Sequence, residues 1–437
     1  MPYNLKDMKI AVIGLGYVGM PLAVALAKYN EVSGYDVNTR RVEELNAGWD
    51  SNREIRQAVL KTTFCKFTSA IEDIKDFDIY IITVPTPIDQ DNNPDLSVVE
   101  KASETLGGVI KKGSIIVYES TVYPGVTEDI CGPILEKTSG LTCGRDFFLG
   151  YSPERINPGD EVHTVENITK VVAGQNEDVA ELLVEMYGQM NNNNIFKAKD
   201  IKTAEASKAI ENAQRDINIA FMNEITMLLN KHGLSVYDVL DAARTKWNFL
   251  PFSPGLVGGH CIGVDPYYLA KSAMDVGHTP EVILSGRKIN DSMGQYLAER
   301  LDQCVKECGD MDTASKNILI LGFTFKENIN DIRNTKVVDI VKTLQQKGYQ
   351  VDIHDPHASA QEVEKEYGLQ VLTKMPQGKQ YDCLALSVPH KAYIQMNVLD
   401  LSALLKSDQN TKPFIYDIKG IWKHIDFEQY GLRYETL

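Results

Sequence analysis

The stretch Lys9–Gly19, KIAVIGLGYVG, joins a short apolar run to a glycine-rich motif. The run Lys9–Gly14 is typical of a β-strand, and Gly14-Leu15-Gly16-Tyr17-Val18-Gly19 follows it as G-x-G-x-x-G. In such a motif Gly14 permits the tight turn, Gly16 lets a pyrophosphate approach the backbone, and Gly19 permits close helix packing. We therefore predict a dinucleotide site whose cofactor contacts include Gly14, Gly16, Tyr17, Val18 and Gly19.

A second strand ending in an acid follows this motif. Glu31–Asp36, EVSGYD, is β-prone, and Asp36 stands seventeen residues after Gly19. An acid at this place binds ribose hydroxyls and disfavours a 2′-phosphate, which favours NAD over NADP. Arg41, just beyond, is expected to flank the adenosine. The plainer alternative is a glycine-rich turn with a solvated aspartate, and the strand–turn–helix context disfavours it.

The segment Ile10–Ala27 carries no charge for eighteen residues, as a signal peptide or a membrane span does. Gly14, Gly16, Gly19 and Pro21 interrupt it in the pattern of a nucleotide site, so we expect neither export nor a membrane. The seven cysteines are scattered and never spaced Cys-x-x-Cys. This argues against a disulfide framework and a structural zinc site, and it favours a cytoplasmic protein without a metal.

The composition is that of an ordinary soluble globular protein, with 43% hydrophobic and 24% charged residues among 437. This length predicts two or three domains. The net charge is −15, from 60 acidic and 45 basic residues, and no run of Lys and Arg forms a basic stripe. Nucleic acid is therefore not an expected partner.

The alternation of strands and helices continues, with strands predicted at 78–84, 114–119 and 147–151. In a parallel sheet the ligand lies at the carboxyl ends of strands. The residues expected there are Pro85, Thr86, Thr121 and Glu154. Glu154 is a candidate base, and the alternative for its proline-rich surroundings is a rigid loop.

A long helix is predicted from Lys202 to about Lys231, because this run contains neither proline nor glycine. At 1.5 Å per residue it would measure roughly 45 Å, which suggests that it bridges two domains and pairs with a copy of itself. Lys208 and Asn212 lie four residues apart and thus on one face. Such residues are usually solvated, so the pattern alone does not make them functional.

The loop Gly258–Asp265, GGHCIGVD, carries one cysteine and one carboxylate among three glycines. We interpret Cys261 as a nucleophile and Asp265 as a group that handles its protons. The three glycines would let the backbone approach a ligand closely. The alternative is a buried, unreactive cysteine beside a turn.

The last third restarts the pattern with strands expected at 317–323, 349–355, 381–389 and 413–417. The run 349–355 echoes 31–36, so we predict a second doubly wound domain that has lost G-x-G-x-x-G and binds a different ligand. The expected fold is α/β, with two Rossmann-like doubly wound domains joined by a long central helix. The expected domains are 1–200 (NAD-binding), 201–308 (central, helical) and 309–437 (carboxyl-terminal).

Seven ordered motifs resemble the UDP-glucose/GDP-mannose dehydrogenase family over nearly the whole chain: GLGYVG, VPTP, ESTVYPG, SPERINPGD, AEASKAIENAQRDINIAF, GGHCIGVDP and GFTFKENINDIRNT. The stretches SPERINPGD and WNFLPFSPGLVGGHCIGVDPYYL are most similar to the bacterial branch of the family that acts on UDP-N-acetylhexosamines. The resemblance implies a four-electron, NAD-dependent oxidation of a UDP-N-acetylhexosamine at C6, for a capsule or O-antigen polysaccharide.

The resemblance also implies roles for single residues. Cys261 would form a thiohemiacetal and then a thioester, with Lys208 and Asn212 at the oxyanion. Asp265 and Thr121 would organise the hydrolytic water. Glu154 matches a glutamate of thioester hydrolysis, but a second glutamate of UDP-glucose enzymes is replaced by Pro158, which puts the base in doubt and argues against UDP-glucose.

Further residues are implied in binding. Arg333 would return to the cofactor, and Arg244 would complete the substrate site of a partner in a homodimer. The substrate contacts expected are Glu154, Arg155, Ile156, Asn157, Lys208, Asn212, Arg244, Phe252, Gly255, Gly258, Lys326 and Lys419.

Three questions stay open from the sequence. The sugar could be UDP-GlcNAc or UDP-GalNAc, with UDP-ManNAc or UDP-glucose as alternatives, because stereocentres depend on pocket shape. A two-electron hydroxyacid or alcohol dehydrogenase would share the first domain. A non-catalytic nucleotide-sugar scaffold would share the whole fold.

Overall fold

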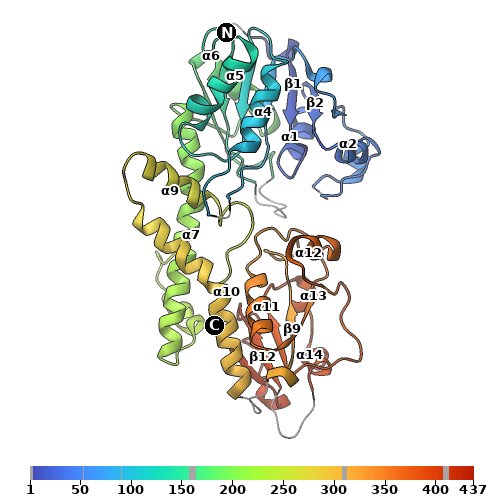
Figure 1. Ribbon diagram of the computed structural model, residues 1–437, viewed down its shortest axis with the longest axis vertical. Helices are drawn as coiled ribbons and strands as arrows, with labels where there is room; N and C mark the ends of the chain where they lie inside the picture. Colours follow the sequence, from blue (N-terminus) through green and yellow to red (C-terminus); the bar gives the residue numbers. More distant parts are fainter. Residues whose placement is uncertain (1–2, 53, 90, 157–163, 308–312, 407–412) are drawn as a thin grey trace. The chain divides into compact units, whose positions relative to one another are not determined.

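The computed structural model describes residues 3–437 except 53, 90, 157–163, 308–312 and 407–412. It divides into two compact units: Met1–Asn212 with Tyr267–Thr279, and Ala213–Pro266 with Pro280–Leu437. The predicted division into three domains stays a prediction, and its boundary at 308 lies outside the described residues. The predicted α/β fold with two Rossmann-like sheets and a long helix is confirmed (Figure 1).

Unit 1 contains an eight-stranded sheet in the order β3-β2-β1-β4-β5-β6-β7-β8. Its first six strands are parallel and follow the Rossmann order, whereas β7 runs antiparallel to β6. The strands are β1 (Lys9–Ile13), β2 (Glu31–Tyr35), β3 (Lys66–Thr68), β4 (Ile79–Ile82), β5 (Ile115–Tyr118), β6 (Phe148–Tyr151), β7 (Lys170–Gly174) and β8 (Ile195–Lys197).

Helices cover both faces of this sheet because successive residues of a strand point to opposite faces. In β1, Ile10 and Val12 join one apolar cluster with the first and sixth helices, whereas Ala11 and Ile13 join another with the fourth and fifth. The helices of unit 1 are α1 (Gly19–Leu26), α2 (Thr39–Asn46), α3 (Gln57–Leu60), α4 (Ser97–Gly107), α5 (Gly132–Ser139) and α6 (Glu177–Met190). The short turns are η1 (Leu5–Asp7), η2 (Ile71–Ile74) and η3 (Val126–Cys131).

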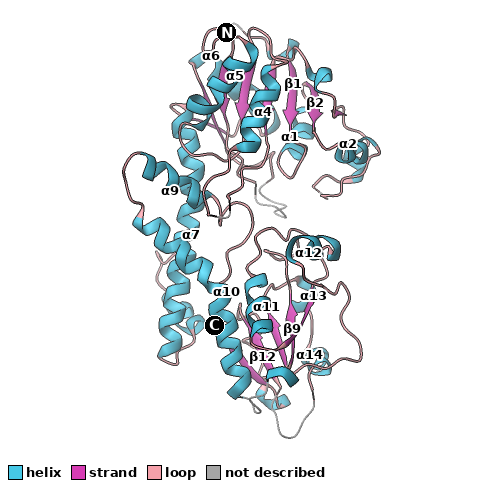
Figure 2. Ribbon diagram, in the orientation of Figure 1, coloured by secondary structure: helices cyan, strands magenta, loops and turns pink. Residues whose placement is uncertain are grey.

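Unit 2 contains a five-stranded parallel sheet in the order β10-β9-β11-β12-β13 (Figure 2). This is the 2-1-3-4-5 order of the other common doubly wound fold. The strands are β9 (Asn317–Leu321), β10 (Gln350–His354), β11 (Cys383–Leu386), β12 (Phe414–Asp417) and β13 (Arg433–Thr436). Ile318 and Ile320 pack toward one apolar cluster, and Leu319 and Leu321 toward the other.

The remaining elements of unit 2 are mostly helical. They are α8 (Val236–Ala243), α10 (Glu281–Glu307), α11 (Val337–Gln346), α12 (Ala360–Tyr367), α13 (Lys391–Ile394), α14 (Val398–Leu404), η4 (Thr313–Ser315) and η5 (Glu428–Tyr430). Two helices pass from one unit to the other: α7 (Ile201–Lys231) and α9 (Asp265–Asp275). The single helix predicted from Lys202 to Lys231 is confirmed, with 31 residues.

The uncharged segment Ile10–Ala27 forms β1, the glycine turn and the eight-residue helix α1. In the part of the chain that the structure describes, none of the helices combines the length and the apolar character that crossing a bilayer requires.

Candidate functional site

The glycine turn after β1 is shaped by backbone contacts. Gly14 has φ +93°, and a Cβ on Gly19 would overlap the carbonyl oxygen of Gly14, so only glycine fits at Gly19. A Cβ on Gly16 would meet no protein atom within 4 Å. The Thr83 hydroxyl donates to the carbonyls of Ile13 (3.0 Å) and Gly14 (2.8 Å), a support that the sequence analysis missed. Tyr17 and Val18 are partly buried in the same turn.

The acid at the end of β2 holds this turn. Asp36 accepts hydrogen bonds from the amides of Leu15 (2.8 Å) and Asn38 (2.9 Å), and its side chain borders a cavity. Arg41 is buried instead of lying open beside that cavity. Its guanidinium donates to the Leu15 carbonyl at 2.9 Å and pairs with Asp50 at 2.7 Å. In this structure Arg41 therefore braces the glycine turn.

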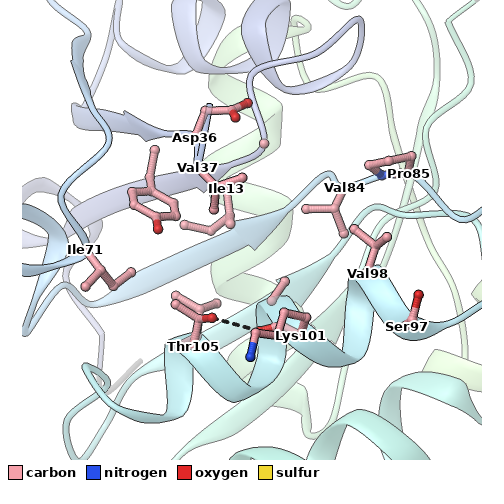
Figure 3. Close-up of a pocket in the computed structure, with 14 residues that line it drawn as sticks. Ile13, Asp36, Val37, Ile71, Val84, Pro85, Ser97, Val98, Lys101 and Thr105 are labelled. Carbon is pink, nitrogen blue, oxygen red and sulfur yellow. Dashed lines mark hydrogen bonds between the residues drawn. The ribbon is translucent and has the colours of Figure 1, made fainter. Parts of the chain in front are cut away.

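A cavity of about 630 Å3 lies beside the turn, where the strand order reverses between β1 and β4 (Figure 3). Its walls are mainly apolar, and the Asp36 carboxylate stands at its edge. It is lined by Ile13, Gly14, Tyr35, Asp36, Val37, Ile71, Val84, Pro85, Ser97, Val98, Lys101, Ala102, Thr105 and Leu106. An apolar slot for a flat base, a carboxylate for ribose hydroxyls and a turn open to phosphate fit NAD.

The other predicted strand-end residues follow neighbouring strands of the same sheet. Pro85 and the partly buried Thr86 follow β4, and Thr121 follows β5. Glu154 follows β6 and is 9% exposed; it accepts a hydrogen bond from the Ile156 amide. Parallel neighbours bring these ends to one edge of the sheet.

The segment after Glu154 is tied to α7. The Arg155 guanidinium donates to Glu211 at 3.2 Å and to the Thr169 carbonyl at 2.8 Å. Ile156 is partly buried, and the predicted substrate contact Asn157 lies outside the described residues, as does Pro158.

Lys208 and Asn212 do not lie on a solvated helix face. Lys208 is 7% exposed and Asn212 is 4% exposed, so both side chains of α7 are buried. Burial of an ammonium group costs free energy unless polar groups or a ligand accept its hydrogen bonds. The alternative that Lys208 and Asn212 are ordinary solvated residues is therefore wrong.

In unit 2 the cysteine loop is packed against residues 325–335. The Gly259 amide donates to the Arg333 carbonyl (3.0 Å), and the Asn334 side chain donates to the Gly259 carbonyl (3.0 Å). Gly259 has φ +80°, and a Cβ there would lie 2.8 Å from the Phe325 ring. The structure thus gives Gly259 a packing reason that the sequence analysis did not foresee.

Cys261 lies at the start of a turn that leads into α9. Its carbonyl accepts from the amides of Val264 (3.0 Å) and Asp265 (2.8 Å), and its side chain is partly exposed. Asp265 is the first residue of α9 and is buried. His260 Nδ1 lies 3.9 Å from a carboxylate oxygen of Asp331.

The loop before the cysteine is held by an asparagine. The Asn223 side chain donates to the Gly255 carbonyl (3.0 Å) and accepts from the Gly255 amide (2.8 Å). Asn223 also donates to Asn290 at 2.8 Å, and Asn290 donates to Asp216, which pairs with Arg287 at 2.6 Å. Phe252, another predicted contact, packs on the core beside this loop.

We predict that Asn223→Ala destabilises unit 2, because it leaves both buried polar groups of Gly255 without their partner. Two such groups should cost about 2–3 kcal/mol of the free energy of unfolding. Urea denaturation followed by tryptophan fluorescence measures this. The control is Asn218→Ala on the same helix, whose partly exposed side chain donates to the Gln214 carbonyl of its own helix. Equal stability of the two variants would contradict the prediction.

A second cavity of about 160 Å3 lies in unit 2 at the carboxyl ends of β9 and β11. The strand order reverses there, which is where ligands bind in such sheets. Three predicted substrate residues line it: Gly258, Lys326 and Lys419. Burial lowers the pKa of the Lys419 ammonium, which donates to the Pro254 carbonyl at 3.2 Å. With Lys336, three lysines line this small cavity, and ammonium groups suit phosphate oxygens.

The second sheet repeats the hydrogen bonds of the first. The amide of Gly322, whose φ is +92°, donates to the carbonyl of His354 at the end of β10, as the Gly14 amide donates to the carbonyl of Tyr35 at the end of β2. Asp355 accepts from the Phe323 amide (2.6 Å), as Asp36 accepts from Leu15. Asp355 also pairs with the buried His390 at 2.9 Å, which holds the pKa of that carboxyl well below its usual range. The sequence analysis missed His390, which also accepts from the Asn328 amide (2.9 Å) in the loop of Lys326.

Two predicted arginines contact their own unit. Arg333 makes a bidentate pair with the buried Asp331, at 2.9 and 2.5 Å. Arg244, at the end of α8, donates to the Ser253 hydroxyl at 2.6 Å. Among the described residues, no group of three or more His, Cys, Asp or Glu side chains is placed to hold a metal ion.

Three family models match the chain in order. They are the NAD binding domain (residues 8–191), the central domain (202–292) and the UDP binding domain (319–424) of the UDP-glucose/GDP-mannose dehydrogenase family. A UDP-N-acetyl-D-glucosamine 6-dehydrogenase of Salmonella typhi is 49% identical over 96% of this chain and 97% of its own. Protein CapL of Staphylococcus aureus is 50% identical over 95% and 96%.

The structure is similar to that of a UDP-D-ManNAc dehydrogenase from Pyrococcus horikoshii, with a TM-score of 0.86 and 29% identity over 98% of this chain and 99% of the other. The predicted family and the predicted cofactor are thereby confirmed. The chain belongs to the UDP-glucose/GDP-mannose dehydrogenase family, and it is an NAD-dependent nucleotide-sugar dehydrogenase.

Proposed function

We propose that this enzyme oxidises the C6 hydroxyl of UDP-N-acetylglucosamine to the carboxylate, in two oxidations by NAD. The observation that carries the proposal is the 49% identity to a UDP-N-acetyl-D-glucosamine 6-dehydrogenase over nearly the full length of both chains. NAD, when bound, accepts a hydride in each oxidation. The similarity to Protein CapL supports a role in making capsule or O-antigen polysaccharide.

The covalent chemistry belongs to the cysteine loop. The Cys261 thiolate adds to the C6 aldehyde and gives a thiohemiacetal, and oxidation of that species yields a thioester that water hydrolyses. A thiol of ordinary pKa, about 8.5, is mostly protonated at neutral pH, so a cation that favours the thiolate aids the addition. Lys208 is proposed for this, and for offsetting charge on the oxyanion with Asn212.

The hydrolytic water and its proton are proposed to be managed by Asp265 and Thr121. Glu154 is the further candidate base. Glu154 is buried, and its carboxylate accepts a hydrogen bond from the nearby Ile156 amide. The carboxylate can still accept a second hydrogen bond from a water, as a general base requires. His260 is proposed to position the loop, since Asp331 stands on one side of its ring.

The cavity of unit 2 is proposed to hold the uridine diphosphate through Lys326, Lys419 and Gly258, with Phe252 and Gly255 beside it. Arg155, Ile156 and Asn157 are proposed as further substrate contacts. Arg333 is proposed as a further cofactor contact, and Arg41 would act through the glycine turn that it braces.

We propose a cytoplasmic homodimer in which Arg244 completes the partner's site. Unit 2 exposes a set of large apolar side chains, and Trp247 is 89% exposed only three residues from Arg244. Such a concentration of exposed apolar surface suits a second copy of the chain. The set comprises Phe221, Leu228, Leu234, Val239, Trp247 and Leu250.

We predict that the purified enzyme releases two NADH per uronate formed and prefers UDP-N-acetylglucosamine. NADH absorbance, measured with UDP-N-acetylglucosamine, UDP-N-acetylgalactosamine, UDP-N-acetylmannosamine, UDP-glucose and GDP-mannose, ranks the substrates. One NADH per product would indicate a two-electron dehydrogenase instead. No NADH with any of these sugars would indicate a non-catalytic scaffold, and preference for another sugar would overturn only the substrate.

A further inference from the structure

We infer that Glu205 is a positioning residue that docks the loop carrying Thr121 onto helix α7. This inference rests on the proposed function, in which Thr121 and Lys208 serve the reaction. Glu205 belongs to the first turns of α7, is completely buried, and lies in the same unit as that loop. It has no part in the chemistry proposed above.

The contacts are two charge-assisted hydrogen bonds to backbone. One carboxylate oxygen of Glu205 accepts from the Gly125 amide at 2.6 Å, and the other accepts from the Thr127 amide at 2.9 Å. These amides open the π-helical turn η3, where a chain has donors that no internal carbonyl receives. The loop from Thr121 to Thr127 is thus fastened at its far end by one side chain.

The same face of α7 carries the proposed catalytic pair. Lys208 follows Glu205 by three residues and Asn212 by seven, so all three lie on one side of the helix, and all three are buried. Glu205 therefore fixes the loop against the helix stretch that presents Lys208. A shift of about 1 Å between such groups is enough to cost about 100-fold in rate.

The grip depends on ionisation. Burial raises the pKa of Glu205 to about 7, although the Thr127 side chain and the amides of Gly125 and Thr127 oppose the rise. The charged or titratable groups around it are Glu128 and Asp129 of η3, Lys202 of α7, and the buried Cys131 thiol. Lys202 is paired with Asp129 at 2.8 Å.

The sign follows from proton linkage. A carboxyl whose pKa is raised by burial binds its proton more tightly in the docked arrangement than it would in water. Docking of the loop is therefore favoured below pH 7 and weakens as the pH rises through about 7, because the charged carboxylate is the form that burial disfavours.

The test variant is Glu205→Gln, whose NH2 group faces an amide donor at every pH. We expect kcat/KM to fall about 10- to 100-fold, because one of the two amides loses its acceptor at every pH. The matched control is Glu224→Gln, an exposed position of the same helix, which should keep the wild-type rate and profile. A Glu205→Gln enzyme with the wild-type rate and pH profile would overturn the inference.

A second measurement needs neither a variant nor a substrate. In the wild-type enzyme, hydrogen–deuterium exchange of the peptide covering 121–131, corrected for intrinsic exchange, should be slowest below pH 7 and speed up as the pH rises through 7. Protection that does not change between pH 6 and 8 would overturn the inference, even if the variant fails to fold. Since no sugar is present, this result is independent of whether the proposed substrate is correct.

Discussion

Cys261→Ala is expected to abolish uronate formation, with a loss of at least about 1,000-fold in kcat, because no other group can form the thioester. NAD binding should stay at the wild-type level, since the glycine turn and the cavity beside Asp36 lie in unit 1. NADH absorbance with UDP-N-acetylglucosamine gives the rate, and NAD titration followed by fluorescence gives the binding constant.

The control is Cys143→Ala, which removes another partly exposed thiol. The Cys143 thiol contacts Gln175 in unit 1 and has no place in the proposed chemistry. Full activity in this variant, beside an inactive Cys261→Ala enzyme, would assign the chemistry to one sulfur. Normal turnover by Cys261→Ala would refute the covalent mechanism.

Gly16→Ala and Gly19→Ala are expected to fail in different ways. A Cβ on Gly16 touches no protein atom, so this variant should keep its stability while the methyl group obstructs the cofactor phosphates. We expect KM for NAD to rise about tenfold or more, corresponding to about 1.4 kcal/mol of binding free energy. Steady-state kinetics and a thermal melt measure the two quantities.

A Cβ on Gly19 overlaps the backbone of Gly14, which cannot move without breaking the turn. Gly19→Ala should therefore lower the free energy of unfolding by about 1–3 kcal/mol, as overpacking does. A loss of stability by Gly16→Ala, or an undisturbed melt for Gly19→Ala, would contradict the assignment of these two glycines.

Much of the fold follows from short-range patterns. Nine strands of the two sheets begin and end within a few residues of their predicted positions, because an apolar run bounded by glycine and proline favours a strand. The long helix was also predictable, since 202–231 lacks any residue that ends a helix. The antiparallel β7 was not, because nothing in the run at 170–174 sets its direction. The short strands β3, β8 and β13 were not predicted either.

The environment of single side chains depends on contacts that spacing does not encode. Lys208 and Asn212 look solvated in a polar helix, and only the packing of α7 shows that they are buried. Arg41 looks like a cofactor ligand until Asp50 and the Leu15 carbonyl receive its guanidinium. Glu205, Asn223 and His390 contact residues that are distant in the sequence. Gly125 lies 80 positions from Glu205, Asn328 lies 62 positions from His390, and Gly255 lies 32 positions from Asn223.

The two hydrogen bonds between the Asn223 side chain and Gly255 bear on how the enzyme responds to acid. The side-chain amide of Asn223 has no proton to gain near neutrality, so the bonds to Gly255 are the same at pH 6 as at pH 8. The segment leading to the cysteine therefore keeps its shape in mildly acidic medium. The shape of this segment is thus insensitive to the same change of pH that titrates Glu205 near pH 7.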